Sequence, residues 1–346
     1  MTSAVRLILL SDALLRGPNP QTVVIGVLVP MSGVMGVAGP SIINCAILAA
    51  ENLSSLDDSE IDLVLIDAGK SPAEVAREVD LLVSANLVDG LVGTHPSNVR
   101  AAVQDVLGGR VPYIFTPPHE GAASSTGSIY LGSNPAEQLS QPITWLSKHR
   151  KISRWALIGN DYVWPRQVHR AARQALAQLG QNVVLDRLVP VGQVDVEELA
   201  HAAKRAGAEA ILVSLIGRDG IDFHRTLTEI GAANHFVRLC SALDENCLLA
   251  AGGDETGNLY SALPNFIKQT DERHLQLMEN YTSRFGVQSP LPGSYAEGCY
   301  DGVHLMGSML AAGLRISAQP MFQSKTTNVA IALGIDLEPI GSFSRV

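Results

Sequence analysis

The chain has 346 residues, of which 46% are hydrophobic and 17% charged. This length and composition predict a globular protein with a sizeable core and room for two domains. The net charge of −9 argues against direct binding of nucleic acid, which requires a clustered basic surface, and against binding to anionic membranes.

The chain begins with a short apolar run that Asp12 interrupts and Arg16 follows. A secretory signal needs a longer apolar region and a small-residue cleavage site, so residues 1–21 are expected to form an N-terminal extension. The four cysteines are scattered without metal-ligand spacing and are expected to be reduced. These features favour a cytoplasmic location, with a periplasmic or extracellular location as the alternative.

From residue 22 onward, apolar segments of strand length alternate with helical patterns, which is typical of parallel α/β units. Ser71-Pro72 illustrates a helix start, because it places an N-cap before a proline in the first helical position. Strands are expected at 23–30, 61–68, 88–94, 111–115, 129–132, 155–160, 183–189, 208–216 and 237–241.

Two later helices, expected at 271–285 and 294–313, have no strand between them and should therefore return to an existing sheet. Weak strand patterns at 328–332 and 341–346 end the chain. The predicted fold class is α/β, with two Rossmann-like lobes in tandem. The lobe boundaries are expected at 22–132 plus 262–324 for lobe 1, and at 133–261 plus 325–346 for lobe 2.

Two glycine-bearing segments match nucleotide-binding loops in part. The segment 68–71 (AGKS) follows a strand, but a phosphate loop needs a further glycine at the position that Val64 occupies. The loop 33–39 has the wrong glycine spacing for a dinucleotide site, and is instead expected to be mobile and to offer Ser32 and backbone amides to a ligand. No hydrolytic motif or metal-ligand spacing is present, so no catalytic residue, metal or cofactor is expected.

The segment 114–121 (IFTPPHEG) is a strand end that runs into a rigid turn. Ligands of open α/β sheets collect at the carboxyl ends of the strands, and two adjacent prolines stiffen this end. Phe115 and Thr116 are therefore expected to lie at a defined position over a pocket, although an ordinary strand–loop junction is the alternative. His95 and His119 are also expected at strand ends.

Two tandem α/β lobes with helices that return to the first resemble the type I periplasmic-binding-protein fold. The resemblance implies a hinge and a ligand cleft between the lobes. Within that family, four stretches are similar to the branch that holds the amide-sensing regulator of aliphatic amidase operons and the urea and short-chain-amide transport receptors. These stretches are 93–103 (GTHPSNVRAAV), 115–121 (FTPPHEG), 131–138 (LGSNPAEQ) and 158–166 (IGNDYVWPR).

The resemblance implies that Ser97 binds the polar head of a ligand and that Tyr162 and Trp164 form an aromatic wall. Packing between the lobes is the alternative role for these two aromatic residues. The family usually has tyrosine where this chain has Phe115, and the missing hydroxyl suggests a more apolar ligand. The candidate ligand-binding residues are Ser97, His95, Phe115, Thr116, Pro117, Tyr162, Trp164, Gly217 and Asp219.

The resemblance implies a non-enzymatic protein that binds a small polar molecule, similar to an amide, urea or an amino acid. The leading interpretation is a ligand sensor that closes on its ligand and contacts a regulatory protein. The alternative is the solute-binding receptor of an ABC transporter, with a membrane permease as its partner. Homodimer formation is left open, and an amide- or nitrile-processing enzyme is a third class that turnover of the ligand would reveal.

Overall fold

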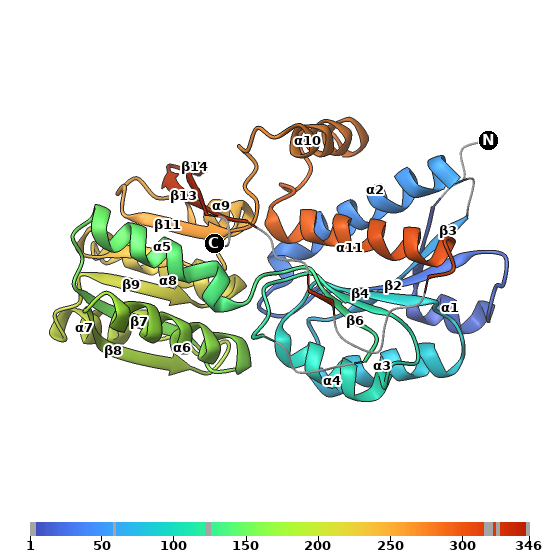
Figure 1. The fold of residues 1–346 in the computed structure, drawn as a ribbon, viewed down its shortest axis with the longest axis horizontal. Helices are drawn as coiled ribbons and strands as arrows, with labels where there is room; N and C mark the ends of the chain where they lie inside the picture. Colours follow the sequence, from blue (N-terminus) through green and yellow to red (C-terminus); the bar gives the residue numbers. More distant parts are fainter. Residues whose placement is uncertain (1–4, 58–59, 122–125, 315–320, 323–325, 344–346) are drawn as a thin grey trace. The chain divides into compact units, whose positions relative to one another are not determined.

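The computed structural model describes residues 5–57, 60–121, 126–314, 321–322 and 326–343. The chain divides into two compact units, each built on one sheet (Figure 1). Unit 1 comprises Met1–Pro117, Ala122–Gly132 and Asp271–Ser324, and unit 2 comprises Pro118–Gly121, Ser133–Thr270 and Lys325–Val346. Among the described residues, no helix is both long and apolar enough to cross a membrane.

The sheet of unit 1 has the strand order β1-β3-β2-β4-β5-β6-β12, and every pair of neighbours is parallel. Long aliphatic side chains fill its central strands because both faces are covered by helices. The strands are β1 (Arg6–Leu9), β2 (Val23–Val29), β3 (Ile61–Asp67), β4 (Gly90–Gly93), β5 (Tyr113–Phe115), β6 (Ser128–Tyr130) and β12 (Met321–Phe322).

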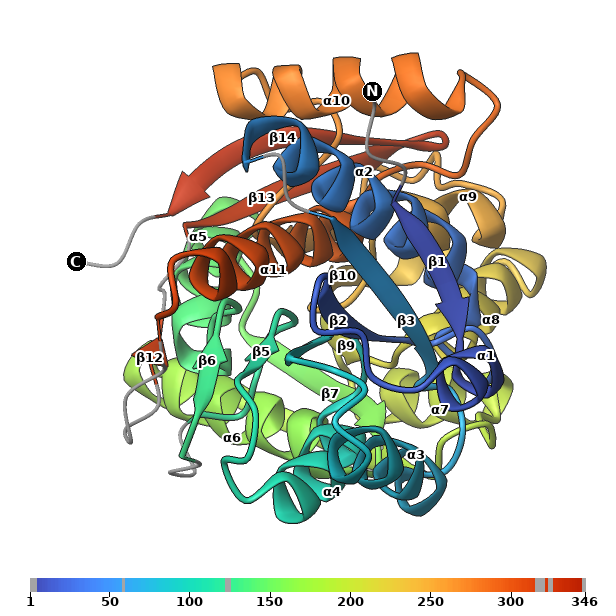
Figure 2. The ribbon, with the colours of Figure 1, turned by 90° about the vertical axis from the view of Figure 1, so that its right-hand side faces the viewer.

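Helices lie on both faces of this sheet (Figure 2). On one face, α2 (Gly39–Asp57) packs against α11 (Ser294–Ala311), and α10 (Glu272–Phe285) contacts α2. On the other face, α3 (Pro72–Ser84) packs against α4 (Ser97–Leu107). The predicted start of α3 is confirmed, since Ser71 and Glu74 form a capping box in front of Pro72.

The sheet of unit 2 has the order β14-β13-β11-β10-β9-β7-β8. Its first five strands along the chain are parallel, and they are β7 (Arg154–Asn160), β8 (Asn182–Val189), β9 (Ala210–Ser214), β10 (Val237–Cys240) and β11 (Leu259–Leu263). An antiparallel hairpin, β13 (Thr327–Leu333) and β14 (Asp336–Phe343), completes it.

The helices of unit 2 are placed by the direction in which the chain moves across the sheet. A right-handed crossover puts α6, which leads outward from β7 to β8, on the opposite face from α7, α8 and α9, which lead back towards β11. Helix α5 packs against α6 (Figure 1). The bounds are α5 (Pro135–His149), α6 (Val163–Gln178), α7 (Val196–Arg205), α8 (Gly217–Glu229) and α9 (Glu245–Ala251).

The amino terminus differs from the expected extension. Residues 6–9 form β1, which pairs in parallel with β3, and α1 (Leu10–Arg16) follows it. The short apolar run suffices because β3 offers an unpaired edge, Ile8 is buried against the core, and Arg6 forms an ion pair with Asp62 at 2.9 Å. Residues 1–4 lie outside the described residues.

The carboxyl terminus is more regular than its weak pattern suggested. The expected strand at 328–332 lies within β13, whereas β14 begins at Asp336, before the expected 341, and residues 344–346 lie outside the described residues. The chain passes from unit 2 to unit 1 at Asp271 rather than at residue 262, because residue 262 lies within β11, where it pairs with β13.

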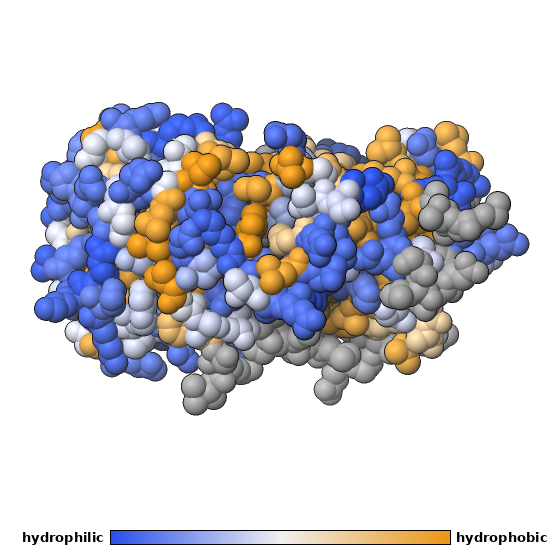
Figure 3. Space-filling model, turned by 90° about the horizontal axis from the view of Figure 1, so that it is seen from above, coloured by the Kyte–Doolittle hydropathy of each residue, from blue (hydrophilic) through white to orange (hydrophobic). Residues whose placement is uncertain are grey.

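The β13–β14 hairpin exposes aliphatic side chains at the edge of its sheet. Leu333, Ile335 and Ile340 are exposed, and the face seen in Figure 3 carries hydrophobic bands between hydrophilic ones. Pro339 lies in this edge strand and cannot donate a backbone hydrogen bond to a further strand. This proline hinders, at one position of β14, the pairing of a further strand with this edge.

A buried ion pair in unit 2 is expected to contribute to the stability of the protein. Arg238 and Asp254 pair at 2.8 Å with side chains that are 0% and 1% exposed. We expect Arg238→Ala to lower the free energy of unfolding by about 3–5 kcal/mol, because it leaves a buried carboxylate without its cation. Arg154→Ala, which breaks the exposed pair with Glu209, should cost less than about 1 kcal/mol. If both variants lost the same free energy of unfolding in urea, the buried pair would be no more important for stability than the exposed pair, which would contradict this prediction.

Candidate functional site

In unit 1, the predicted ligand residues follow β4 and β5 at their carboxyl ends. Ser97 is buried and is the first residue of α4, where the helix dipole favours negative charge or a hydrogen-bond acceptor. Thr116 is buried, and its hydroxyl lies 2.7 Å from that of Thr94. Pro117 is also buried. The structure therefore places these residues at the carboxyl ends of two neighbouring strands.

His95 is held on both sides within unit 1. Its Nδ1 lies 3.1 Å from the carbonyl oxygen of Pro96, and its Nε2 lies 2.9 Å from the hydroxyl of Tyr113. This arrangement fits a neutral ring that donates from Nδ1 and accepts at Nε2. Burial lowers the pKa of His95 to about 4, so the ring is uncharged at neutral pH. Both ring nitrogens already have hydrogen-bond partners within the protein, so His95 offers no free polar group to a ligand.

Phe115 is a core residue rather than an exposed wall of a pocket. It is fully buried, and its ring meets His95 edge-on at 5.4 Å between centroids and Tyr130 at 6.3 Å. The guanidinium of Arg100 lies 5.6 Å from the centre of the same ring. An aromatic residue without a hydroxyl fits this environment, since a buried tyrosine hydroxyl would need a partner.

The loop after β2 is tied down, contrary to the prediction of a mobile loop that offers Ser32 and its amides. The carboxylate of Asp67 accepts hydrogen bonds from the amides of Met31, Ser32 and Gly69 at 2.9–3.2 Å, and from the Ser32 hydroxyl at 2.7 Å. Burial opposes the charge, but these hydrogen bonds outweigh it and lower the pKa of Asp67. The backbones approach so closely that a Cβ on Gly69 would lie 2.0 Å from the Ser32 carbonyl oxygen.

In unit 2, Tyr162 and Trp164 lie at the start of α6, directly after β7. Tyr162 lines a pocket of about 550 Å³, and burial, with the charge of Glu120, raises the pKa of its phenol. Trp164 is 4% exposed, and its Nε1 has no hydrogen-bond partner among the described residues. A buried donor without a partner costs about 1–3 kcal/mol, which makes this N–H a candidate for binding a ligand.

The end of β9 is clamped to the end of β7. Asp219 is buried, and its Oδ2 accepts hydrogen bonds from Asn160 Nδ2 at 2.6 Å and from the Gly192 amide at 2.8 Å. Asn160 Oδ1 in turn accepts the Ile216 amide at 2.9 Å. Gly217 begins α8 with φ of +48°, a conformation that favours glycine. Asp219 therefore holds the strand ends, and at least one of its carboxylate oxygens is committed to that role.

Several important residues were missed by sequence reasoning. Asp67, Asn160 and His169 each hold a strand end through side-chain hydrogen bonds. Asp67 and Asn160 carry a weak signal, since each is a polar residue at the end of an apolar strand. His119, noted at the sequence level, accepts the Gly121 amide at Nδ1 in unit 2.

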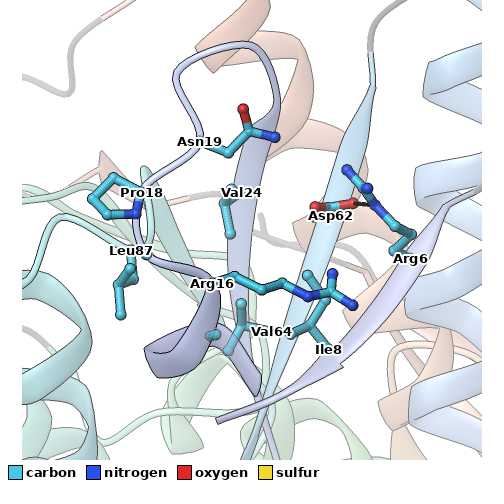
Figure 4. Close-up of a pocket in the computed structure, with 11 residues that line it drawn as sticks. Arg6, Ile8, Arg16, Pro18, Asn19, Val24, Asp62, Val64 and Leu87 are labelled. Atoms are coloured by element: carbon cyan, nitrogen blue, oxygen red, sulfur yellow. Dashed lines mark hydrogen bonds and ion pairs between the residues drawn. The ribbon is translucent and has the colours of Figure 1, made fainter. Parts of the chain in front are cut away.

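A second pocket, of about 290 Å³, lies in unit 1 at the amino ends of β1, β2 and β3 (Figure 4). Its lining mixes aliphatic side chains with the polar side chains of Arg6, Arg16, Asn19 and Asp62, and Arg6 pairs there with Asp62 (Figure 4). None of the predicted ligand residues lines it. Ligands of α/β sheets collect at the opposite ends of the strands, so we assign no function to this pocket. Across the described ranges, no group of three His, Cys, Asp or Glu side chains could hold a metal ion.

Comparisons with known proteins agree with this architecture. A sequence model described as periplasmic binding protein matches residues 22–327. The Leu/Ile/Val-binding protein homolog 7 of Brucella suis is 28% identical over 237 residues, which cover 63% of this chain and 59% of the length of that relative.

Two solved structures show the same fold. An amino acid ABC transporter substrate-binding protein from Pseudomonas fluorescens superposes with a TM-score of 0.82 at 13% identity, over 95% of this chain and 97% of that one. A solute-binding protein of an ABC transporter from R. palustris, in complex with 4-hydroxybenzoate, has a TM-score of 0.80 at 15% identity, over 93% and 97%.

The low pKa of His95 predicts a loss of stability in mild acid. The unfolded chain takes up a proton near pH 6.5 but the folded chain only near pH 4, so stability is present above pH 6.5 and falls as the pH drops towards 4. The free energy of unfolding that is lost through this one group is about 3 kcal/mol. We expect His95→Gln to remove this component, measured as a shallower fall in the free energy of unfolding between pH 7 and 4.5. Parallel curves for the two proteins would contradict it.

Proposed function

This chain belongs to the periplasmic binding protein family, and we propose that it is a solute-binding protein that presents a small molecule to the permease of an ABC transporter. The family consists of binding proteins rather than enzymes. The proteins named above are described as a homolog of a Leu/Ile/Val-binding protein, an amino acid ABC transporter substrate-binding protein and a solute-binding protein in complex with 4-hydroxybenzoate. These descriptions support the transport interpretation over the sensor. A location outside the cytoplasm is part of this proposal.

The observation that carries the proposal is the buried Nε1 of Trp164, which has no hydrogen-bond partner among the described residues and lies in the first turn of α6, directly after β7. We infer that a ligand supplies the acceptor for this N–H in unit 2. In unit 1, considered by itself, the Ser97 hydroxyl at the start of α4 is the proposed ligand-binding group. These groups are uncharged, whereas Asp67, Asp219 and His95 are already engaged with protein atoms. The proposed solute therefore carries a hydrogen-bond acceptor that such donors can bind.

The sensor remains a second candidate because of the stretches 93–103 and 158–166, which are similar to the amide-sensing branch. Fractionation of native cells separates the two functions. Protein recovered with the extracytoplasmic fraction supports a transport receptor. Protein confined to the cytosol and bound to a regulatory protein would support the sensor instead.

A thermal-shift screen tests ligand binding. The panel holds branched-chain amino acids, 4-hydroxybenzoate, short aliphatic amides and urea. A ligand at about 100 times its dissociation constant adds about 2.7 kcal/mol, and we expect one class to raise the melting temperature by several degrees. The bound compound should be recovered unchanged after long incubation. Turnover of the compound, or no shift with any class, would contradict the proposal.

Trp164→Phe separates ligand binding from packing. The substitution keeps an aromatic ring but removes the Nε1 donor, so the unliganded protein should be as stable as the wild type or up to about 1–3 kcal/mol more stable. Affinity for the compound found in the screen should fall about 5- to 150-fold, as expected for one lost hydrogen bond of that size.

The matched control is Trp145→Phe, which changes the tryptophan of α5 that stacks on His149. Its affinity should equal that of the wild type in titration calorimetry. If Trp164→Phe also binds like the wild type, the Nε1 group has no part in recognition.

A further inference from the structure

Three side chains of unit 2 form a hydrogen-bonded chain across its sheet. His169 of α6 places Nδ1 2.6 Å from Oδ1 of Asp186 on β8, and Nε2 3.1 Å from the hydroxyl of Ser214 at the end of β9. His169 is 1% exposed and Ser214 0%. Arg173, one turn further along α6, forms an ion pair with the same Asp186. The order of groups, Asp–His–Ser, is that of a hydrolytic triad.

The surroundings of Ser214 rule out nucleophilic chemistry. A nucleophile must reach the reacting carbon of a substrate, but this serine has no exposed surface. Its hydroxyl lies 3.4 Å from the carbonyl oxygen of Ile158, and a Cβ on Gly159 would lie 2.1 Å from the same hydroxyl oxygen. His169 and Asp186 line the pocket of about 550 Å³ that Tyr162 also lines, but Ser214 does not reach it. The three hydrogen-bonded side chains therefore hold the elements of the unit in place.

The Asp186–His169–Ser214 hydrogen bonds join the elements that carry the proposed ligand residues of unit 2. Trp164 lies five residues before His169 on α6, and Ser214 lies three residues before Gly217. Gly159 on β7 lets α6 approach the sheet, since a Cβ there would lie 2.9 Å from His169 Nε2 and 3.2 Å from the Cβ of Pro165. His169 therefore fixes the distance between the start of α6 and the end of β9.

The charge of Asp186 supports this arrangement. Burial opposes its ionisation, but the hydrogen bond with His169 and the charges of Arg173 and Arg187 outweigh burial and lower its pKa. The carboxylate is thus a permanent acceptor at neutral pH. It orients the imidazole so that Nδ1–H points to β8 and Nε2 faces the hydroxyl of Ser214.

We infer that His169 is a positioning residue for ligand binding. By bridging Asp186 and Ser214, it holds Trp164 at a fixed position relative to the end of β9. This inference rests on the proposed function, because it assigns a role in the same site. It adds that recognition in unit 2 depends on a buried group that does not touch the ligand.

His169→Phe and Ser214→Ala test the inference in the full chain. His169→Phe keeps a ring but removes both hydrogen bonds, and Ser214→Ala removes one and serves if the first variant does not fold. The control is Gln181→Met, which removes two hydrogen bonds, to Ser147 and to the indole of Trp155, at the amino end of β7. The control therefore perturbs the same strand at the end away from the proposed site.

The first readout needs no ligand. In proton–nitrogen NMR spectra, the indole resonance of Trp164 should shift in His169→Phe and, less, in Ser214→Ala, whereas Gln181→Met should shift that of Trp155 and leave Trp164 in place. Because Ser214→Ala changes no aromatic ring, a shift of the Trp164 signal in that variant reports a displacement and not a change of ring current. An unchanged Trp164 resonance in both test variants would overturn the inference.

The second readout is affinity for L-leucine, 4-hydroxybenzoate and acetamide as defined probes, measured below the melting temperature of each variant. For a probe that binds the wild type, we expect about tenfold weaker binding in His169→Phe and unchanged binding in Gln181→Met. Equal affinity in all three proteins, or an equal loss in the control, would overturn the inference. If no probe binds the wild type, the proposed function fails for these ligands, while the Trp164 resonance still decides the role of His169.

Discussion

In each unit, the chain reverses the direction in which it moves across the sheet, and the candidate ligand-binding residues depend on this reversal. In unit 1, β2 and β4 are neighbours, and the helices that follow them, α2 and α4, pack on opposite faces; in unit 2 the same holds for β7 and β9 with α6 and α8. Where neighbouring strands send their helices to opposite faces, no helix covers the strand ends, and polar backbone groups there need other partners. The predicted ligand residues lie at or next to these two points.

The partners of buried polar groups decide which of these residues can serve a ligand. Asp67 and Asp219 look like free carboxylates at strand ends, yet each accepts several hydrogen bonds from its own unit. Such partners stabilise a carboxyl group that is buried, as in Asp219, or partly buried, as in Asp67, so both residues organise loops. Trp164 is the reverse case, because its N–H is buried and has no partner among the described residues.

Residue type alone does not show whether a group of side chains can act on a substrate, because the nucleophile must also be accessible to that substrate. The Asp186, His169 and Ser214 side chains have the order of a hydrolytic triad, but a serine without exposed surface cannot attack a substrate. A sequence pattern cannot reveal such a chain, since its members come from β8, α6 and β9. Their meeting depends on the strand order β9-β7-β8 and on the close approach that Gly159 allows.

The sequence by itself determined most of the succession of strands and helices from residue 22 to 311, because apolar periodicity and caps such as Ser71 act locally. It also placed Ser97, Tyr162 and Trp164 at the carboxyl ends of strands. It did not predict β11, which pairs with β10 and β13. Tertiary structure decided that Arg6–Leu9 joins the sheet, since pairing with β3 stabilises a run too short to persist alone. It likewise decided that His95 and Phe115 are engaged in the core, because the partners of a buried side chain come from segments that lie far apart in the sequence.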